Sequence, residues 1–81
     1  MIYEFENHLK ELIISCGEDI LINDINENTD LVRDFNFNSI SLIQLVVNIE
    51  SAFNIEIDDE NLLFERLSPY KGLVKIIENS I

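Results

Sequence analysis

The feature that most constrains the fold of this chain is a predicted helix, residues 39–53, that is apolar on nearly every side. At 100° per residue one face collects five apolar side chains, which we predict to be core: Leu42, Leu45, Val46, Ile49 and Phe53. A second stripe carries Ile40, Ile43 and Val47, with Gln44 and Ser51 beside it. A protein of 81 residues has a modest core, so we expect one of the two faces to be free for a partner.

Two interpretations of the second stripe remain open. In the first, Ile40, Ile43 and Val47 pack beneath the preceding loop or a short later helix. In the second, they form an exposed apolar ridge that docks against other proteins, as an amphipathic helix docks in a groove. The second interpretation makes Ile40, Ile43, Gln44 and Val47 the candidate partner-binding residues.

Ser39 begins this helix and is the candidate site of chemistry. The first N–H groups of a helix lack partners and the helix dipole is positive there, so a phosphate attached to the Ser39 hydroxyl would be stabilised. The simpler interpretation is that Asn38 or Ser39 is only an N-cap. We do not expect Ser39 to be a catalytic nucleophile, because the only histidine, His8, belongs to a different predicted helix.

Length and charge restrict the class of protein further. The 81 residues predict a single domain, 1–81, and the net charge of −11 excludes nucleic acid and anionic membranes as expected partners. The same acidity favours a monomer and basic protein partners. The N-terminus lacks the pattern of a secretory signal, and the single cysteine, Cys16, is compatible with a reducing compartment, so we expect a cytoplasmic protein.

The remaining chain predicts an all-α fold, a small three-to-four-helix bundle with a long first loop. Residues 3–16 have the spacing of a helix that ends at Gly17, and residues 17–38 predict an ordered loop whose scattered apolar side chains enter the core: Ile20, Ile22, Ile25 and Leu31. After an extended link at 54–58, residues 59–66 predict a short helix with Leu62, Leu63 and Leu67 pointing inward. Ser68-Pro69 predicts the start of a last helix, whose core face is Tyr70, Leu73, Val74, Ile77 and Ile81.

No catalytic or metal site is expected. His8 is interpreted as a solvent-facing residue and Cys16 as a small buried hydrophobe. The acidic segment 24–30 superficially resembles a calcium loop, but it lacks the glycine at the sixth position, and Phe35 stands where a bidentate glutamate is required. The chain therefore lacks the residues of an enzyme.

The segment from Asp34 to Ile40, Asp-Phe-Asn-Phe-Asn-Ser-Ile, resembles the attachment motif of the carrier-protein family, usually written Asp-Leu-Gly-x-Asp-Ser-Leu. These are the acyl, peptidyl and aminoacyl carriers, and the resemblance continues over almost the whole chain. It implies a bundle of the acyl-carrier type and a covalent 4′-phosphopantetheine arm, derived from coenzyme A, on Ser39. Asn38, beside it, falls within the implied cofactor-binding site.

Three departures from the family pattern are informative. Asn36 replaces the glycine, which asparagine can mimic because it tolerates a left-handed backbone. Asn38 replaces the usual acid before the serine. The positions of Ser41 and Gln44 are typically acidic in bacterial fatty-acid carriers and are neutral here. Recognition is therefore expected to depend on the apolar stripe more than on charge, which favours a specialised pathway over housekeeping fatty-acid synthesis.

As the resemblance implies, the partners would be a phosphopantetheinyl transferase, an enzyme that loads acyl or aminoacyl groups, and a downstream synthase or transferase. The cargo would be an acyl, aminoacyl or peptidyl group held as a thioester, in a fatty-acid-like, polyketide or nonribosomal peptide pathway. The alternative is a non-enzymatic helical adaptor, which binds partners through Ile40, Ile43 and Val47 and carries no phosphopantetheine.

Overall fold

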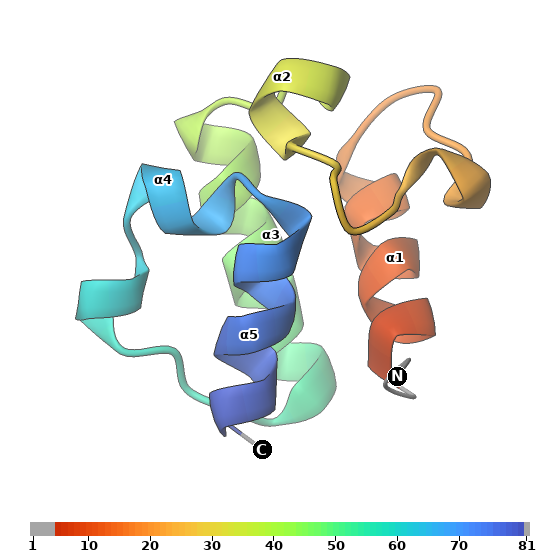
Figure 1. Ribbon diagram of the computed structural model, residues 1–81. Coiled ribbons are helices and arrows are strands. Elements are labelled where there is room, and N and C mark those ends of the chain that lie inside the picture. Colours follow the sequence, from red (N-terminus) through yellow and green to blue (C-terminus); the bar gives the residue numbers. More distant parts are fainter. Residues whose placement is uncertain (1–4, 81) are drawn as a thin grey trace.

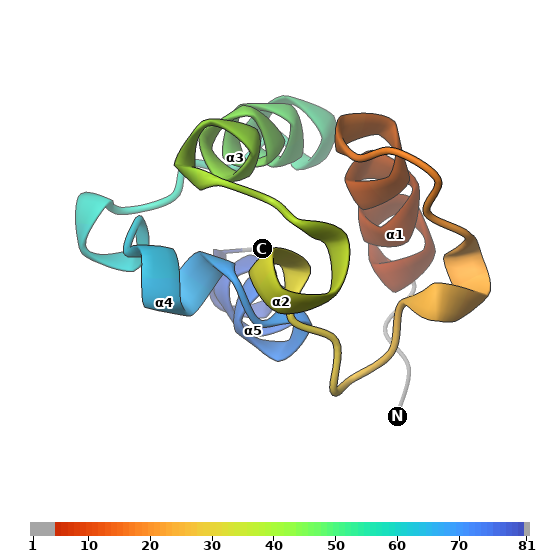
Figure 2. The ribbon, with the colours of Figure 1, turned by 90° about the horizontal axis from the view of Figure 1, so that it is seen from above.

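The computed structural model describes residues 5–80, which are helical apart from turns, loops and one isolated bridge between Asp30 and Pro69. The elements are α1 (Phe5–Cys16), η1 (Ile22–Asp24), α2 (Leu31–Phe35), α3 (Ser39–Phe53), η2 (Asp59–Asn61), α4 (Phe64–Leu67) and α5 (Tyr70–Ser80), where η denotes a 3-10 helix. The three long helices α1, α3 and α5 form a bundle, and α2 lies across one end of it (Figures 1 and 2). The predicted all-α bundle with a long first loop is confirmed.

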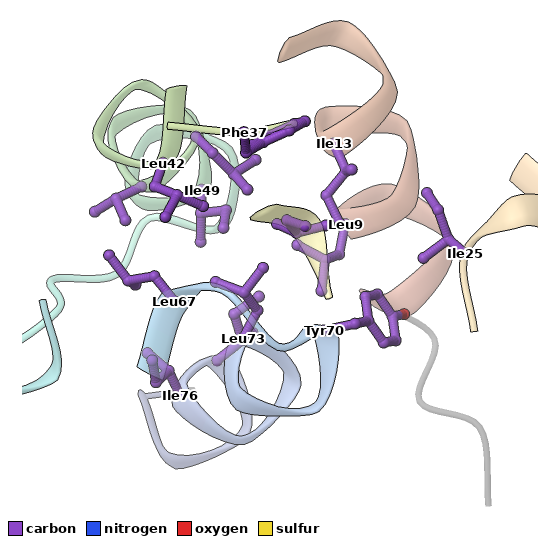
Figure 3. Packing of buried hydrophobic residues seen from close by; sticks show 14 of the residues in the cluster. Leu9, Ile13, Ile25, Phe37, Leu42, Ile49, Leu67, Tyr70, Leu73 and Ile76 are labelled. Carbon is purple, nitrogen blue, oxygen red and sulfur yellow. The ribbon is translucent and has the colours of Figure 1, made fainter. Parts of the chain in front are cut away.

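The core lies between the three long helices, where apolar side chains of α1, α3 and α5 converge (Figure 3). Four of the five predicted core residues of α3 are buried: Leu42, Leu45, Val46 and Ile49. Phe53 is only half-buried, at the rim, where its ring makes edge contacts with Phe5 and the exposed His8 at centroid distances of 6.1 and 5.0 Å. On α5, Tyr70, Leu73 and Ile77 are buried as predicted and Val74 is half-buried, whereas Ile81 lies outside the described residues.

The first loop is ordered, as predicted, and buries Ile20, Ile25, Leu31 and Phe37 in the core. Ile22 is exposed, so its predicted burial was wrong; it begins the 3-10 turn η1, which keeps it at the surface.

The loop also contains a helix, α2, that the sequence did not predict. Asp30 caps it by accepting hydrogen bonds from the N–H groups of Val32 and Arg33, and Asp34 accepts one from the Asp30 N–H. This reciprocal arrangement stabilises five residues that are too few for a visible helical periodicity.

A latch joins the end of the first loop to the start of α5. The Leu31 N–H donates to the Ser68 carbonyl (2.7 Å), the Tyr70 N–H donates to the Thr29 carbonyl (2.9 Å), and the Ser68 hydroxyl donates to the Asp30 carboxylate. These bonds fix the loop on both sides of the Asp30–Pro69 bridge. The latch therefore holds α2, and the chain that follows it, at a defined position above the bundle.

Asp30 gives the latch a pH dependence. The hydrogen bond from Ser68, followed by those from backbone N–H groups, lowers the pKa of the Asp30 carboxyl below its usual value. Because the folded-state pKa is lowered, the stabilisation is present above the unfolded pKa of about 3.9 and is lost as the pH falls through the folded-state pKa.

At pH 7 we expect Asp30→Ala to lower the free energy of unfolding by about 1 kcal/mol through loss of the α2 cap. We expect Asp30→Asn, which keeps a capping oxygen, to lower it by less. Urea unfolding from pH 7 to pH 3 checks this, and an Asp30→Asn curve parallel to that of the wild type would contradict it.

The segment 59–67 differs from the single short helix predicted there. The chain forms η2, becomes extended at Leu63, and then makes the single turn of α4. Because the helical register is interrupted, only Leu67 reaches the core, and the inward orientation predicted for Leu62 and Leu63 was wrong.

Gly72, within α5, lies against the backbone of the preceding turn. A Cβ atom at this position would clash with the carbonyl oxygen of Arg66. The missing side chain therefore allows α4 and α5 to pack closely around Pro69, which compensates for the low helix propensity of glycine.

Candidate functional site

The start of α3 is capped by Asn38 and not by Ser39. Asn38 has an extended backbone, and its side-chain oxygen accepts hydrogen bonds from the N–H group (2.9 Å) and the hydroxyl (3.2 Å) of Ser41. Ser39 is consequently the first helical residue, so the interpretation of Ser39 as a plain N-cap is wrong.

The Ser39 hydroxyl is exposed and available for chemistry. Ser39 lies on the surface, and within residues 5–80 no hydrogen bond engages its hydroxyl. It stands at the N-terminus of a helix of 15 residues, where N–H groups and the helix dipole favour an anion. A phosphate ester formed on this oxygen would gain that stabilisation without displacing an existing hydrogen bond.

The turn before Ser39 depends on Asn36 and Phe37. Asn36 ends α2 with a left-handed backbone (φ 59°, ψ 30°), as the sequence predicted for an asparagine in the position of the family's glycine. The Phe37 N–H then donates to the Leu31 carbonyl (3.1 Å), and the Phe37 side chain enters the core. The buried Phe37 side chain thus fixes the chain directly before Asn38 and Ser39, where α3 begins.

The second stripe of α3 is exposed. Ile40, Ile43 and Val47 have 56 to 75% of their surface accessible, and Gln44 is also exposed. The interpretation in which these residues pack beneath a loop or a short helix is therefore wrong. We call Ile40, Ile43 and Val47 the α3 ridge; it extends along the helix from the residue next to Ser39.

The α3 ridge has no charge of its own. Glu50 is the only charged residue of α3, and its carboxylate accepts a hydrogen bond from the Ile57 N–H (2.9 Å). Glu50 therefore secures the turn after α3, and the surface around Ser39 is uncharged along the helix.

A second group of apolar residues, missed by sequence reasoning, faces the α3 ridge across a small crevice. The crevice has a volume of about 80 Å³ and is lined by Ser39, Leu42, Ile43, Leu62, Phe64 and Leu67. The available signal was the run Leu62-Leu63-Phe64, because three successive large apolar residues cannot all point inward from a helix that has only one buried face.

Cys16 and the acidic side chains of residues 5–80 do not form a second site. Cys16 is half-buried, less than predicted, and its sulfur lies 3.4 Å from the Asn48 amide nitrogen. Within residues 5–80, no three His, Cys, Asp or Glu side chains gather as a metal site would require. None of the helices in this part of the chain is long and apolar enough to span a bilayer.

Comparisons with known proteins agree with this geometry. The family described as "Phosphopantetheine attachment site" matches residues 16–75. The acyl carrier protein of Coprothermobacter proteolyticus is 32% identical over 78 residues, which cover 96% of this chain and 87% of the relative. The acyl carrier protein of Wolinella succinogenes is 30% identical over 74 residues, which cover 89% of this chain and 91% of the relative.

Proposed function

The chain belongs to the phosphopantetheine-attachment family of carrier proteins, and from this premise we propose that Ser39 is the residue that bears its arm. As a member of this family it is a carrier with covalently attached 4′-phosphopantetheine and not an enzyme. The observation that carries the proposal is the exposed, unengaged Ser39 hydroxyl at the N-terminus of α3. We further propose that residues 1–81 act as one domain, as a monomer in the cytoplasm.

The residues at the start of α3 fit the chemistry of a phosphodiester. Asn38 satisfies the Ser41 N–H, while the helix dipole still favours negative charge beside Ser39. Because Asn38 is neutral, it adds no repulsion to a phosphate at the next residue. We propose that Asn38 positions Ser39 by capping α3; a direct contact of Asn38 with the arm remains a prediction.

In this arrangement the phosphopantetheine arm and the protein chain have different roles. When attached, the group supplies a terminal thiol that holds cargo as a thioester. The chain supplies the hydroxyl, the anion-favouring helix end and the recognition surface. A phosphopantetheinyl transferase acts on the chain first, and biosynthetic enzymes then dock on it in turn; tethering raises the effective concentration of cargo at each of them.

The surface around Ser39 supports a specialised carrier. The α3 ridge is apolar, the Glu50 carboxylate accepts a hydrogen bond from the Ile57 N–H at the far end of the helix, and the positions of Ser41 and Gln44 offer a partner no carboxylate. We propose that the loading and downstream enzymes recognise Ile40, Ile43, Gln44 and Val47, in a polyketide, nonribosomal peptide or other dedicated acyl or aminoacyl pathway. An apolar surface of this kind favours partner enzymes that do not bind α3 through a groove of basic residues.

Val47→Glu tests the docking role of the α3 ridge. Val47 is exposed, so we expect the free energy of unfolding to change by no more than about 0.5 kcal/mol. A carboxylate buried against an apolar partner loses hydration, so we expect kcat/KM with the loading enzyme to fall by at least about tenfold. Ala52→Glu, at an exposed position of the same helix on a different side from the ridge, adds the same charge as a control. Unchanged kinetics with every partner enzyme would contradict a docking role for the ridge.

Intact mass after incubation with coenzyme A, Mg²⁺ and a broad-specificity transferase tests the carrier function itself. A gain of one phosphopantetheinyl group, located to Ser39 by fragmentation, is the expected result. No gain from the folded protein, beside a control carrier that is modified, would favour the adaptor that uses the α3 ridge without an arm.

A further inference from the structure

A groove between α4 and α5 is separate from the surface around Ser39. It has a volume of about 500 Å³ and follows α5 from Pro69, just before the helix, to Asn79 near its end. At a rise of about 1.5 Å per residue, this span gives the groove a length of about 15 Å. α5 lies across the core from α3 (Figure 2), and the groove shares no lining residue with the α3 ridge or with the crevice at Ser39.

The positive charge of this acidic chain is gathered at the groove. Arg66, Lys71 and Lys75 are three of the five basic residues, and the segment 66–77 that contains them has no acidic residue, although Glu65 and Glu78 flank it. All three basic side chains are exposed, and two of them, Arg66 and Lys75, line the groove. The groove therefore differs in charge from the rest of the molecule.

The three cations are not neutralised by the chain's own carboxylates. Among residues 5–80 one ion pair forms, between Arg33 and Asp34, although the chain has 16 acidic side chains for five basic ones. Arg66 instead donates a hydrogen bond from Nη1 to the Asn61 side-chain oxygen (2.9 Å), which orients the guanidinium and leaves its other N–H groups for a ligand. Cations left in this state attract carboxylates, so the groove is complementary to an anionic partner.

The shape and lining of the groove favour a peptide. The least exposed of its apolar residues, Ile76 and Pro69, form the floor, and the side-chain amides of Asn61 and Asn79 lie beside it. An amide side chain can both donate to and accept from a peptide backbone. We propose that the groove binds an extended acidic segment of a partner protein, with an apolar side chain of that segment on the floor and its carboxylates at Arg66 and Lys75.

Other anionic occupants match these observations less well. A single phosphate or carboxylate would fill only a small part of an elongated groove. An anionic membrane would also face the acidic remainder of the surface, and a second copy of this chain, with a net charge of −11, would be repelled. A narrow acidic segment avoids this repulsion because it meets the cations alone. The inference does not depend on the assignment of Ser39, and a segment bound in the groove leaves Ser39 open to an enzyme.

A titration of the unmodified, ¹⁵N-labelled protein tests the groove. The probe is the synthetic peptide acetyl-Asp-Glu-Leu-Glu-Asp-amide, followed by nuclear magnetic resonance. We expect saturable shifts of the backbone amide signals of Gly72, Lys75 and Asn79, and none along the α3 ridge. The Kd should rise by at least about tenfold between low and high ionic strength. The uncharged peptide acetyl-Asn-Gln-Leu-Gln-Asn-amide is the control and should give no saturable shift.

Three substitutions give effects of different size and sign. We expect Lys75→Gln to raise the Kd by at least about fivefold, and Lys71→Gln, the same change on α5 outside the groove, to raise it by less than about twofold. Glu65→Gln should lower the Kd, because Glu65 is the one acidic residue that lines the groove. All three positions are exposed, and circular dichroism verifies that each variant is folded.

The contrary outcomes are distinct. A folded wild type without saturable shifts in the groove would overturn the peptide site, and equal effects of Lys71→Gln and Lys75→Gln would overturn it in favour of diffuse charge attraction. A dimer in sedimentation that Lys75→Glu disrupts would assign the groove to a second copy and overturn the proposed partner. Loading with coenzyme A and a transferase reports the carrier function separately, and Lys75→Gln should be loaded as the wild type is.

Discussion

Ser39→Ala is expected to abolish modification completely: after incubation with coenzyme A, Mg²⁺ and a transferase, its intact mass should stay that of the unmodified chain. The substitution removes the only atom proposed to form the phosphoester bond. It should leave the fold intact, because Ser39 is exposed, Asn38 caps the helix, and alanine is favoured within helices. We expect the free energy of unfolding to change by no more than about 0.5 kcal/mol.

Ser41→Ala is the matched control for this result. Ser41 lies two residues farther along the same turn, and its hydroxyl only donates to the capping oxygen of Asn38. It should gain one phosphopantetheinyl group as the wild type does, although the weaker contact with Asn38 should reduce stability slightly. Robust modification of Ser39→Ala would contradict the assignment of Ser39, and loss of modification in both variants would point to a damaged helix start.

The faces of α3 could be predicted from sequence because helical geometry alone determines them. With 100° between successive residues, Leu42, Leu45 and Ile49 must share a side, and these residues are indeed buried. The same geometry separated the stripe that begins at Ile40. It could not decide whether that stripe was covered, since this depends on where the segment 59–67 lies, which is determined by tertiary packing.

The environment of Ser39 could be predicted only in part, because it is built by contacts between distant residues. The latch pairs Thr29, Asp30 and Leu31 with residues near Ser68, a separation that no local pattern encodes. The exposure of the Ser39 hydroxyl also depends on the choice of Asn38 as cap, and both residues are good caps by propensity. The sequence therefore identified the serine, and the structure was needed to show that its hydroxyl is unengaged.

Phe37→Ala is expected to produce the largest loss of stability among these variants. Phe37 is only 3% exposed and lies two residues before Ser39, packed in the core that the first loop shares with the bundle. Removing a buried phenyl ring leaves a cavity and typically lowers the free energy of unfolding by about 3–5 kcal/mol. Because small domains have only about 5–15 kcal/mol in total, urea unfolding should show a large shift of the midpoint.

Phe64→Ala provides the matched comparison for stability, since it removes the same ring from an exposed position at the start of α4. We expect its free energy of unfolding to fall by less than about 1 kcal/mol. The difference between the two variants measures how firmly the turn before Ser39 is anchored. Hydrogen exchange at the Ser41 amide, which Asn38 caps, should accelerate in Phe37→Ala and not in Phe64→Ala. Equal losses of stability would contradict Phe37 as the anchor, because the start of α3 would then be held by the cap and the latch alone.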